Sequence, residues 1–359
     1  MKAVIFGLKG TTLLPEERAF FERVQPLGFI LFRRNCDNPE QIRSLVHDLK
    51  STLTHDDVPI LIDQEGGRVV RLYPPHFRSN PPAHLFGDLY QTNPHQASEL
   101  VFENYALIAQ ELRDLGVNTN CAPCADLLFD GSDPIIGDRA FSKKGDTVST
   151  LSAVAINAHN RNGVMPVIKH LPGHGRADAD SHEKLPVVDT DEETLGMTDF
   201  LAFFMALESL PVHPWGMTAH IIYSAIDPVS CATESLIVIQ NVIRGVIGFK
   251  GFLISDCISM KALSGSYAQR AGRAIAAGCD AVLYCMGDLD VMAEVAAAVP
   301  ELSGDALDRC FMRSNDFGAM PLSSKESRLQ RDVVFQQKMK DLGKVWQSRL
   351  STIGEGAVF

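Results

Sequence analysis

About eight short apolar runs, each followed by a stretch with helical spacing, constrain the fold of this 359-residue chain most strongly. Short apolar runs that alternate with helices are typical of buried parallel strands. The alternation predicts an α/β fold, a TIM-type (β/α)8 barrel, with an open doubly wound sheet as the rival arrangement. The expected strands are residues 3–7, 28–32, 59–62, 117–121, 164–168, 215–220, 251–255 and 281–285.

Polar residues stand at the ends of five of these runs, from the third to the seventh. A barrel gathers the carboxyl ends of its strands around one mouth, whereas an open sheet spreads them along an edge. The placement therefore favours the barrel and predicts one pocket that these residues share. They are Asp63, Asp126, Lys169, His170, His220 and Asp256.

The chain shows no internal repeat and no linker, so we expect a single barrel domain over residues 1–300. Residues 301–359 are expected to form a C-terminal helical extension, packed on the barrel or trailing from it. Within it, residues 330–350 are predicted to form a charged helix with no further strand.

Composition excludes several classes of partner. A net charge of -11 argues against general binding to nucleic acid or to anionic membranes. No apolar run reaches the roughly 18 residues that a membrane-spanning helix needs. The eight cysteines are scattered and mostly in apolar company, which suits reduced thiols in a cytoplasmic protein. We expect a cytoplasmic monomer without a metal or cofactor.

The segment from Lys169 to His182 is dense in histidine, glycine and aspartate and directly follows a buried strand, so it belongs at the mouth of a pocket. Three kinds of site are compatible with these residues. His170, His174 and His182 could bind a metal, although Pro172 and Gly173 prevent the helix that HExxH spacing needs. Asp180 and His182 could serve a serine, although no GxSxG motif is present. Alternatively, Asp256 is a nucleophile and His182 a general acid/base, as in glycoside hydrolysis.

Five motifs, taken together and in order, resemble glycoside hydrolase family 3, in particular its single-domain bacterial β-N-acetylglucosaminidases of peptidoglycan recycling. The resemblance covers residues 1 to about 300. The motifs are Ile62-Asp63-Gln64-Glu65-Gly66-Gly67-Arg68-Val69-Val70-Arg71, Lys169-His170-Leu171-Pro172-Gly173-His174-Gly175, Asp180-Ser181-His182, Met217-Thr218-Ala219-His220 and Ile254-Ser255-Asp256.

The resemblance implies a retaining β-N-acetylhexosaminidase, with residues 1–300 as the catalytic domain. By this resemblance Asp256 matches the nucleophile that forms a covalent glycosyl-enzyme, and His182, paired with Asp180, matches the acid/base. The residues that match those holding the terminal sugar are Asp63, Arg71, Arg139, Lys169 and His170. The implied partner is a small carbohydrate, either a muropeptide or a chitooligosaccharide.

The sequence departs from the family pattern at two positions beside the catalytic motifs. Leu171 stands where the family usually has Phe, and Cys257 stands where an acidic residue is common. Both departures bear on specificity more than on activity. A β-glucosidase or a phosphorylase of the same family remains open, as does a sugar-binding barrel without turnover.

Physical chemistry agrees with the implied roles. We expect Lys169 and Arg71 to hold the pKa of the Asp256 carboxyl down, because a nucleophilic carboxylate must be ionised. An imidazole, with an ordinary pKa of about 6.5, suits acid/base work near neutral pH. His220 is equally open to two interpretations, a hydrogen-bonded core histidine or a ligand to substrate.

Two further residues are interpreted as structural. We expect Arg68 to bond main-chain carbonyls under the barrel mouth, and His174 to brace its own loop.

Overall fold

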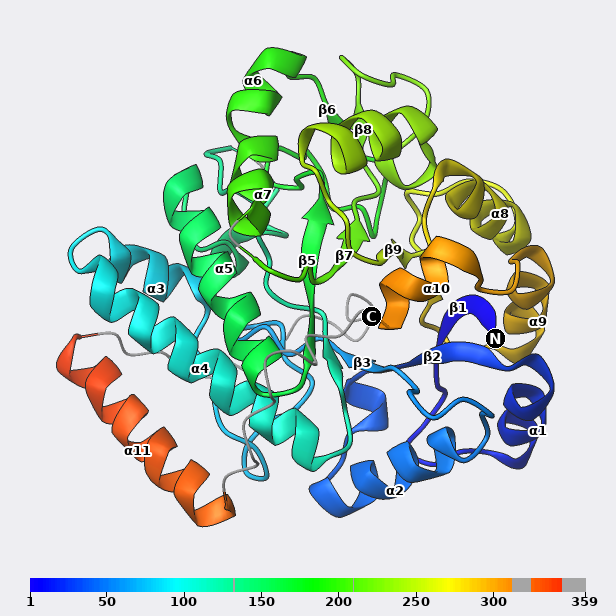
Figure 1. The fold of residues 1–359 in the computed structure, drawn as a ribbon, viewed down its shortest axis with the longest axis horizontal. Helices are drawn as coiled ribbons and strands as arrows, with labels where there is room; N and C mark the ends of the chain where they lie inside the picture. Colours follow the sequence, from blue (N-terminus) through cyan, green and yellow to red (C-terminus); the bar gives the residue numbers. More distant parts are fainter. Residues whose placement is uncertain (132, 209, 312–323, 344–359) are drawn as a thin grey trace.

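In a computed structural model that describes residues 1–131, 133–208, 210–311 and 324–343, parallel strands close into an eight-stranded barrel ringed by helices (Figure 1). The order around the barrel is β1, β10, β9, β7, β5, β4, β3 and β2. The (β/α)8 prediction is confirmed, and the open doubly wound sheet is wrong. The barrel strands are β1 (Lys2–Gly7), β2 (Pro26–Leu31), β3 (Ile60–Ile62), β4 (Thr119–Asn120), β5 (Met165–Leu171), β7 (Trp215–Thr218), β9 (Leu253–Cys257) and β10 (Ala281–Tyr284).

Successive side chains of a barrel strand point alternately into two different hydrophobic clusters. On β1, Val4 and Phe6 belong to the large apolar cluster that also contains the helix side chains, whereas Ala3 and Ile5 belong to a second cluster drawn from the strands. Both faces of the strand are therefore buried, which explains why the barrel strands read as continuous apolar runs instead of alternating ones.

The helices lie outside the strands, mostly one after each strand (Figure 1). No helix in the described ranges is both long and apolar enough to cross a bilayer. The helices up to β7 are α1 (Pro15–Val24), η1 (Arg33–Asn35), α2 (Pro39–Lys50), α3 (Ala83–Tyr90), α4 (Pro94–Asp114), η2 (Gly137–Arg139), α5 (Gly145–Arg161), α6 (Glu192–Met197) and α7 (Asp199–Glu208). The helices after β7 are η3 (Ala232–Glu234), η4 (Val238–Val246), α8 (Tyr267–Ala277), α9 (Leu289–Ala298), α10 (Gly304–Phe311) and α11 (Lys325–Asp341).

Strand β4 is shorter than the sequence predicts. Only Thr119 and Asn120 form the strand, although Cys121 still donates its N–H to the Ile62 carbonyl at 2.8 Å. Pro123, which follows soon after, has no N–H to extend the hydrogen-bond ladder. The two remaining strands, β6 (Val187–Val188) and β8 (Ile222–Tyr223), pair with each other outside the barrel.

The C-terminal part of the described chain covers two places on the barrel. Cys310, at the end of α10, shares the inner cluster with Trp215, and its carbonyl accepts the Trp215 indole N–H at 3.3 Å. Helix α11 lies along α4 (Figure 1), where Arg331 pairs with Glu103 at 2.8 Å. The helix predicted over 330–350 thus begins earlier, at Lys325, and the predicted part from 344 to 350 lies outside the described residues. A domain boundary at residue 300 stays a prediction.

Removing a buried ring between strands and helix α1 is expected to destabilise the barrel. Phe21 is fully buried and packs its ring at 4.8 Å from that of Phe29. We expect Phe21→Ala to lower the free energy of unfolding by about 3–5 kcal/mol, because the cavity cannot collapse fully. Denaturant unfolding measures this loss. The same deletion at Phe204, which is 36% exposed, serves as the control and should cost far less.

Candidate active site

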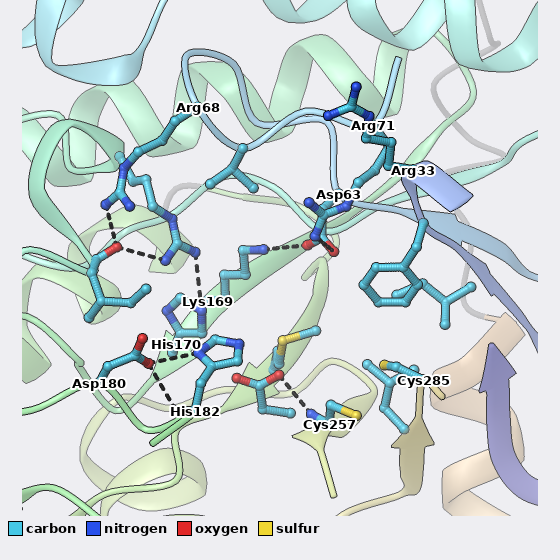
Figure 2. A pocket seen from close by; sticks show the side chains of 18 of the residues that line it. Arg33, Asp63, Arg68, Arg71, Lys169, His170, Asp180, His182, Cys257 and Cys285 are labelled. Carbon is cyan, nitrogen blue, oxygen red and sulfur yellow. Dashed lines mark hydrogen bonds and ion pairs between the residues drawn. The ribbon is translucent and has the colours of Figure 1, made fainter. Parts of the chain in front are cut away.

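A cavity of about 820 Å³ opens at the carboxyl ends of the barrel strands (Figure 2). Asp63 reaches it from just after β3, Lys169 and His170 from the end of β5, and Asp256 from β9. Further strand residues and the loops between strands and helices supply the rest. All eight residues that the sequence predicted for the site line this cavity: Asp63, Arg71, Arg139, Lys169, His170, Asp180, His182 and Asp256.

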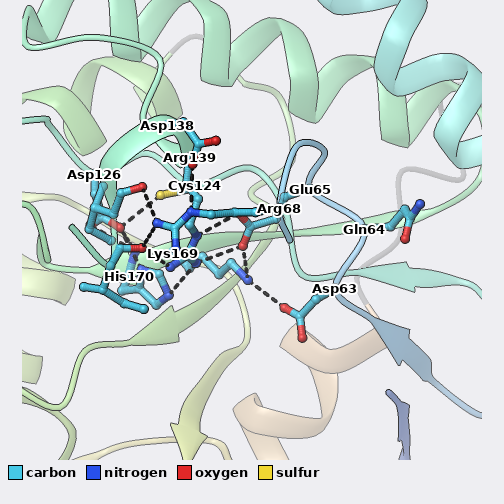
Figure 3. Close-up of polar contacts among 12 residues, drawn as sticks. Asp63, Gln64, Glu65, Arg68, Cys124, Asp126, Asp138, Arg139, Lys169 and His170 are labelled. Atoms are coloured by element: carbon cyan, nitrogen blue, oxygen red, sulfur yellow. Dashed lines mark hydrogen bonds and ion pairs between the residues drawn. The ribbon is translucent and has the colours of Figure 1, made fainter. Parts of the chain in front are cut away.

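The floor of the cavity is a chain of alternating charges (Figure 3). The Lys169 ammonium lies 2.7 Å from Asp63 Oδ1 and 2.7 Å from Glu65 Oε1. Arg139 donates to both oxygens of Glu65 at 2.9 Å, and Arg71 Nη2 donates to Asp63 Oδ2 at 3.1 Å. A buried charge is stable only when it is paired and hydrogen-bonded, and here each carboxylate meets two cations.

These pairs keep every group of the floor ionised. Burial by itself raises the pKa of the Asp63 carboxyl, but the charges of Lys169 and Arg71 lower it more, so the net shift is downward. For Glu65, burial likewise raises the pKa, and Arg139 and Lys169 together bring it well below its ordinary value. Neutral pH therefore leaves a preorganised array of donors and acceptors at the bottom of the cavity.

Glu65 was not among the predicted site residues; it does not itself line the cavity, but it holds Lys169 and Arg139, which do. Its signal was present in the sequence, because it lies two residues after Asp63 in the motif that follows the third strand. Asp126, expected in the shared pocket, does not line the cavity and instead lies beneath its wall as a support. It is fully buried, and it accepts a hydrogen bond from His170 Nδ1 at 2.7 Å and one from the His174 N–H at 2.6 Å.

One group of buried side chains in the described ranges has the composition of a metal site. Ligand atoms of Cys124, Asp126 and His170 lie within 4.8 Å of one another. Hydrogen bonds already join them, since Cys124 Sγ and His170 Nδ1 both bond Asp126 Oδ2, at 3.2 and 2.7 Å. The Arg139 guanidinium also lies 3.4 Å from His170 Nε2. This arrangement fits a hydrogen-bonded support for the His170 ring better than a cation site.

Asp256 lies near the end of β9, and its Oδ1 accepts the N–H of Cys257 at 2.7 Å. Burial raises the pKa of its carboxyl, but His220, His170 and His182 lower it, and the net shift is downward. The expected ionisation is therefore present, whereas the expected cause is wrong. Lys169 is held by Asp63 and Glu65, and Arg71 by Asp63, so the histidines set the field at Asp256 instead.

His220 is a core histidine and does not line the cavity. Its Nδ1 lies 2.7 Å from Thr233 Oγ1 and its Nε2 lies 3.1 Å from the Cys257 carbonyl oxygen. Both ring nitrogens are thus used inside the protein. The expectation that His220 shares the pocket with Asp63, Lys169 and Asp256 is wrong, because the ring is buried and bonded to Thr233 and to the main chain of β9.

Asp180 and His182 form a hydrogen-bonded pair at the edge of the cavity (Figure 2). His182 Nδ1 lies 2.7 Å from Asp180 Oδ1, and the His182 main-chain N–H donates to the same oxygen at 2.8 Å. The side chains are 31% and 25% exposed, His182 and Asp180 respectively. Burial lowers the pKa of the imidazole, but the hydrogen bond to Asp180 and the charge of Asp256 raise it more.

The loop that carries this pair is anchored at its start. Gly175 fits where a Cβ would lie 1.8 Å from the Leu127 carbonyl oxygen, so a larger residue would displace the loop. The buried His174 ring lies 3.3 Å from Ser181 Oγ, and Arg176 pairs with Asp199 at 2.7 Å. His174 thus braces its own loop, as predicted.

The rest of the cavity lining was only partly foreseen. Arg68 donates to Asp138 Oδ1 at 2.8 Å and to the carbonyls of Pro134 and Ile135 at 2.7 and 2.6 Å, which is the predicted structural role. Four further lining residues come from the segment just after β2 and from the loop after β3, and no motif in the sequence pointed to them. They are Phe32, Arg33, Arg34 and Tyr73.

Sequence comparison places the chain among known enzymes. The Glycosyl hydrolase family 3 N terminal domain matches residues 13–310. The Beta-hexosaminidase of Alkalilimnicola ehrlichii is 38% identical over 285 residues, which cover 79% of this chain and 80% of that protein. The Beta-hexosaminidase of Chromobacterium violaceum is 35% identical over 301 residues, covering 83% of this chain and 82% of that one.

Solved structures agree. Native NagZ from Neisseria gonorrhoeae superposes with a TM-score of 0.80 at 27% identity, over 96% of this chain and 94% of that one. The family 3 beta-N-acetylglucosaminidase of Paenibacillus sp. gives a TM-score of 0.76 at 29% identity, over 94% of this chain and 61% of that one. The chain therefore belongs to glycosyl hydrolase family 3, as a glycoside hydrolase that acts as a β-N-acetylhexosaminidase.

Proposed function

We propose that this enzyme removes terminal, non-reducing β-linked N-acetylglucosamine from peptidoglycan-derived muropeptides of the GlcNAc-anhydroMurNAc type. The reaction would run through a covalent glycosyl-Asp256 intermediate, with His182 as general acid/base. The observation that carries the proposal is that Asp256 and the His182–Asp180 pair border the same cavity and influence each other's ionisation.

Charge supports this division of roles. The pKa of the Asp256 carboxyl is lowered and that of the His182 imidazole is raised, so between the two values Asp256 is ionised while His182 is protonated. A retaining glycosidase needs this combination for its first step. The carboxylate attacks the anomeric carbon, and the imidazolium gives its proton to the departing glycosidic oxygen.

The second step reverses the role of the imidazole. Neutral His182 takes a proton from a water molecule, which attacks the anomeric carbon and releases Asp256. Asp180 acts through His182: by accepting the hydrogen bond from Nδ1, it leaves Nε2 as the atom that exchanges the proton. This assignment agrees with the partial exposure of His182 toward the cavity.

The charged floor suits the sugar itself. Asp63, Arg71, Arg139, Lys169 and His170 are proposed to bind the hydroxyl and acetamido groups of the terminal residue, with Glu65 holding Lys169 and Arg139 in place. Fixed, paired charges bind a polar sugar without reorganising. In support, NagZ from Neisseria gonorrhoeae, with a TM-score of 0.82 to this chain, has been solved in complex with N-trifluoroacetyl-D-glucosamine.

We further propose that the enzyme acts as a monomer in the cytoplasm, in peptidoglycan recycling and thus in cell wall biogenesis, with effects on cell shape and division. Its eight cysteines are free thiols, which suits a reducing compartment. No metal or cofactor enters the proposed steps, because Asp256 and His182 supply the nucleophile and the proton.

Substrates with different leaving groups can distinguish the role of Asp256 from that of His182. Asp256→Ala should abolish hydrolysis of every substrate. His182→Ala should lower the rate by about 10²–10⁴-fold for a sugar leaving group and spare the first step for an activated aryl one. Steady-state and burst kinetics with p-nitrophenyl β-N-acetylglucosaminide and with a disaccharide measure the difference.

Azide supplies the control. It needs no general base, so it should restore turnover of His182→Ala on the aryl substrate and give the β-glycosyl azide, because two inversions retain configuration. An α-azide, or equal losses on both leaving groups, contradicts these roles.

The pH profile should depend on Asp180. In the free enzyme, kcat/KM is expected to fall on the basic side as His182 loses its proton, at a pH above the ordinary 6.5 of histidine because its pKa is raised. Asp180→Asn removes the negative charge and leaves a weaker, neutral acceptor beside His182, so less opposes the effect of burial and the basic limb should move to lower pH. An unmoved limb in Asp180→Asn would show that another group controls it.

Substrate preference tests the finer part of the proposal. We expect kcat/KM to be higher for a GlcNAc-anhydroMurNAc peptide than for chitobiose or a p-nitrophenyl β-glucoside, measured by released sugar. Adding phosphate should leave the product as free N-acetylglucosamine. A preference for chitobiose rejects the muropeptide, and formation of a sugar phosphate makes the enzyme a phosphorylase.

A further inference from the structure

Two thiols line the cavity beside the proposed nucleophile (Figure 2). Cys257 follows Asp256 directly at the end of β9, and Cys285 follows the end of the neighbouring strand β10. Cys257 is only 4% exposed, but its side chain belongs to the cavity wall, so a small molecule in the cavity reaches it. The proposed catalytic steps use neither sulfur.

Polar groups flank the Cys257 sulfur. Its Sγ lies 3.0 Å from Ser259 Oγ, and the Cys285 thiol lines the same wall of the cavity, just after the neighbouring strand β10. The Arg34 guanidinium lies in the same wall of the cavity, held by the Leu8 carbonyl at 2.8 Å. A hydroxyl that can donate a hydrogen bond and a nearby cation are surroundings that favour a thiolate.

Ionisation of the cysteines agrees with this geometry. Burial and the negative charge of Asp256 raise the pKa of the Cys257 thiol, but hydrogen bonding with Cys285 and Ser259 lowers it more, so the net shift is downward. Burial raises the pKa of Cys36 to about 12, and it raises the pKa of Cys285 well above its ordinary value. Cys285 therefore stays protonated, so of these two thiols Cys257 is the one that ionises more readily.

We propose that Cys257 is a modification site for small neutral oxidants such as hydrogen peroxide, and that its oxidation stops glycoside hydrolysis. The Cys257 thiolate attacks one peroxide oxygen; an S–O bond forms and the O–O bond breaks. The sulfur is oxidised to a sulfenic acid, the peroxide is reduced, and the leaving hydroxide takes a proton from solvent to give water. Peroxide is uncharged and small, so the cavity admits it.

The loss of activity follows from position. The new oxygen enters the cavity one residue from Asp256, where it occupies space and adds a polar group that the sugar must displace. This consequence rests on the proposed function only in that the cavity holds the terminal sugar. The chemistry of Cys257 itself does not depend on which carbohydrate is bound.

The experiment treats the reduced full-length enzyme with hydrogen peroxide and follows residual activity on p-nitrophenyl β-N-acetylglucosaminide. In parallel, dimedone traps the sulfenic acid and peptide mass analysis locates it. We expect the label on Cys257, protection by N-acetylglucosamine, and recovery of activity with dithiothreitol in an unlabelled sample.

Variants sharpen the assignment, each compared with its own starting activity. Cys257→Ser should slow inactivation by about tenfold or more, because the remaining thiols hold far less thiolate. Cys36→Ser is the matched control, since Cys36 is more exposed but lies outside the cavity, and it should leave the rate of inactivation unchanged. Cys285→Ala should slow inactivation, and Cys285→Ser, which still donates a hydrogen bond, should restore it.

The labelling and protection results decide whether Cys257 is the oxidation site. Dimedone on another cysteine, or inactivation that N-acetylglucosamine does not slow, overturns it. Should Cys257→Ser fold poorly, the label position and the protection in the wild-type enzyme still decide. Failure of the muropeptide proposal would appear as a different substrate preference in untreated enzyme, and it would leave the labelling result untouched.

Discussion

The Lys169 ammonium, 3% exposed between the carboxylates of Asp63 and Glu65, is the interaction on which the site depends. A cation taken out of water in this way needs compensating charge, and removing one partner of such a set costs roughly 3–5 kcal/mol. The same contacts align strand β5 with the loop after β3. Stability of the barrel mouth and the shape of the sugar pocket therefore have one physical origin.

This network also explains why the proposed nucleophile is served by histidines. The cations of the floor are already committed to Asp63 and Glu65, so Asp256 meets His220, His170 and His182 instead. An imidazole can change its charge during a reaction, whereas a paired ammonium or guanidinium does not. The field around Asp256 is thus the part of the site that pH can alter.

Much of this arrangement could be predicted from the sequence, and the reasons are specific. Apolar runs such as 281–285 gave the strands, and the strand-end rule placed Asp63, Lys169 and Asp256 at one mouth. The family motifs supplied the loop residues Asp180 and His182. The ends of the strands were harder to predict, because β4 shrinks to two residues and its length depends on neighbours far away in the chain.

What the sequence could not give is the pairing of charges. Which carboxylate holds Lys169, and whether His220 faces the cavity or the core, are decided by side-chain directions on neighbouring strands. Glu65 was missed because the sequence of a motif does not show which of its acidic residues pair with Lys169. His220 stood at the right strand end and still turns both nitrogens inward.

Closure of the barrel has a consequence for synthesis of the chain. Phe6 on β1 and Tyr284 on β10 are neighbours in the ladder, so β1 has one unpaired edge until the last strand has been made. At about 5–20 residues per second, the ribosome needs roughly 15–55 s to cover that distance. Throughout this interval β1 presents free N–H and C=O groups beside apolar side chains, a template for pairing with other chains. A fragment that ends before β10 keeps that edge open permanently.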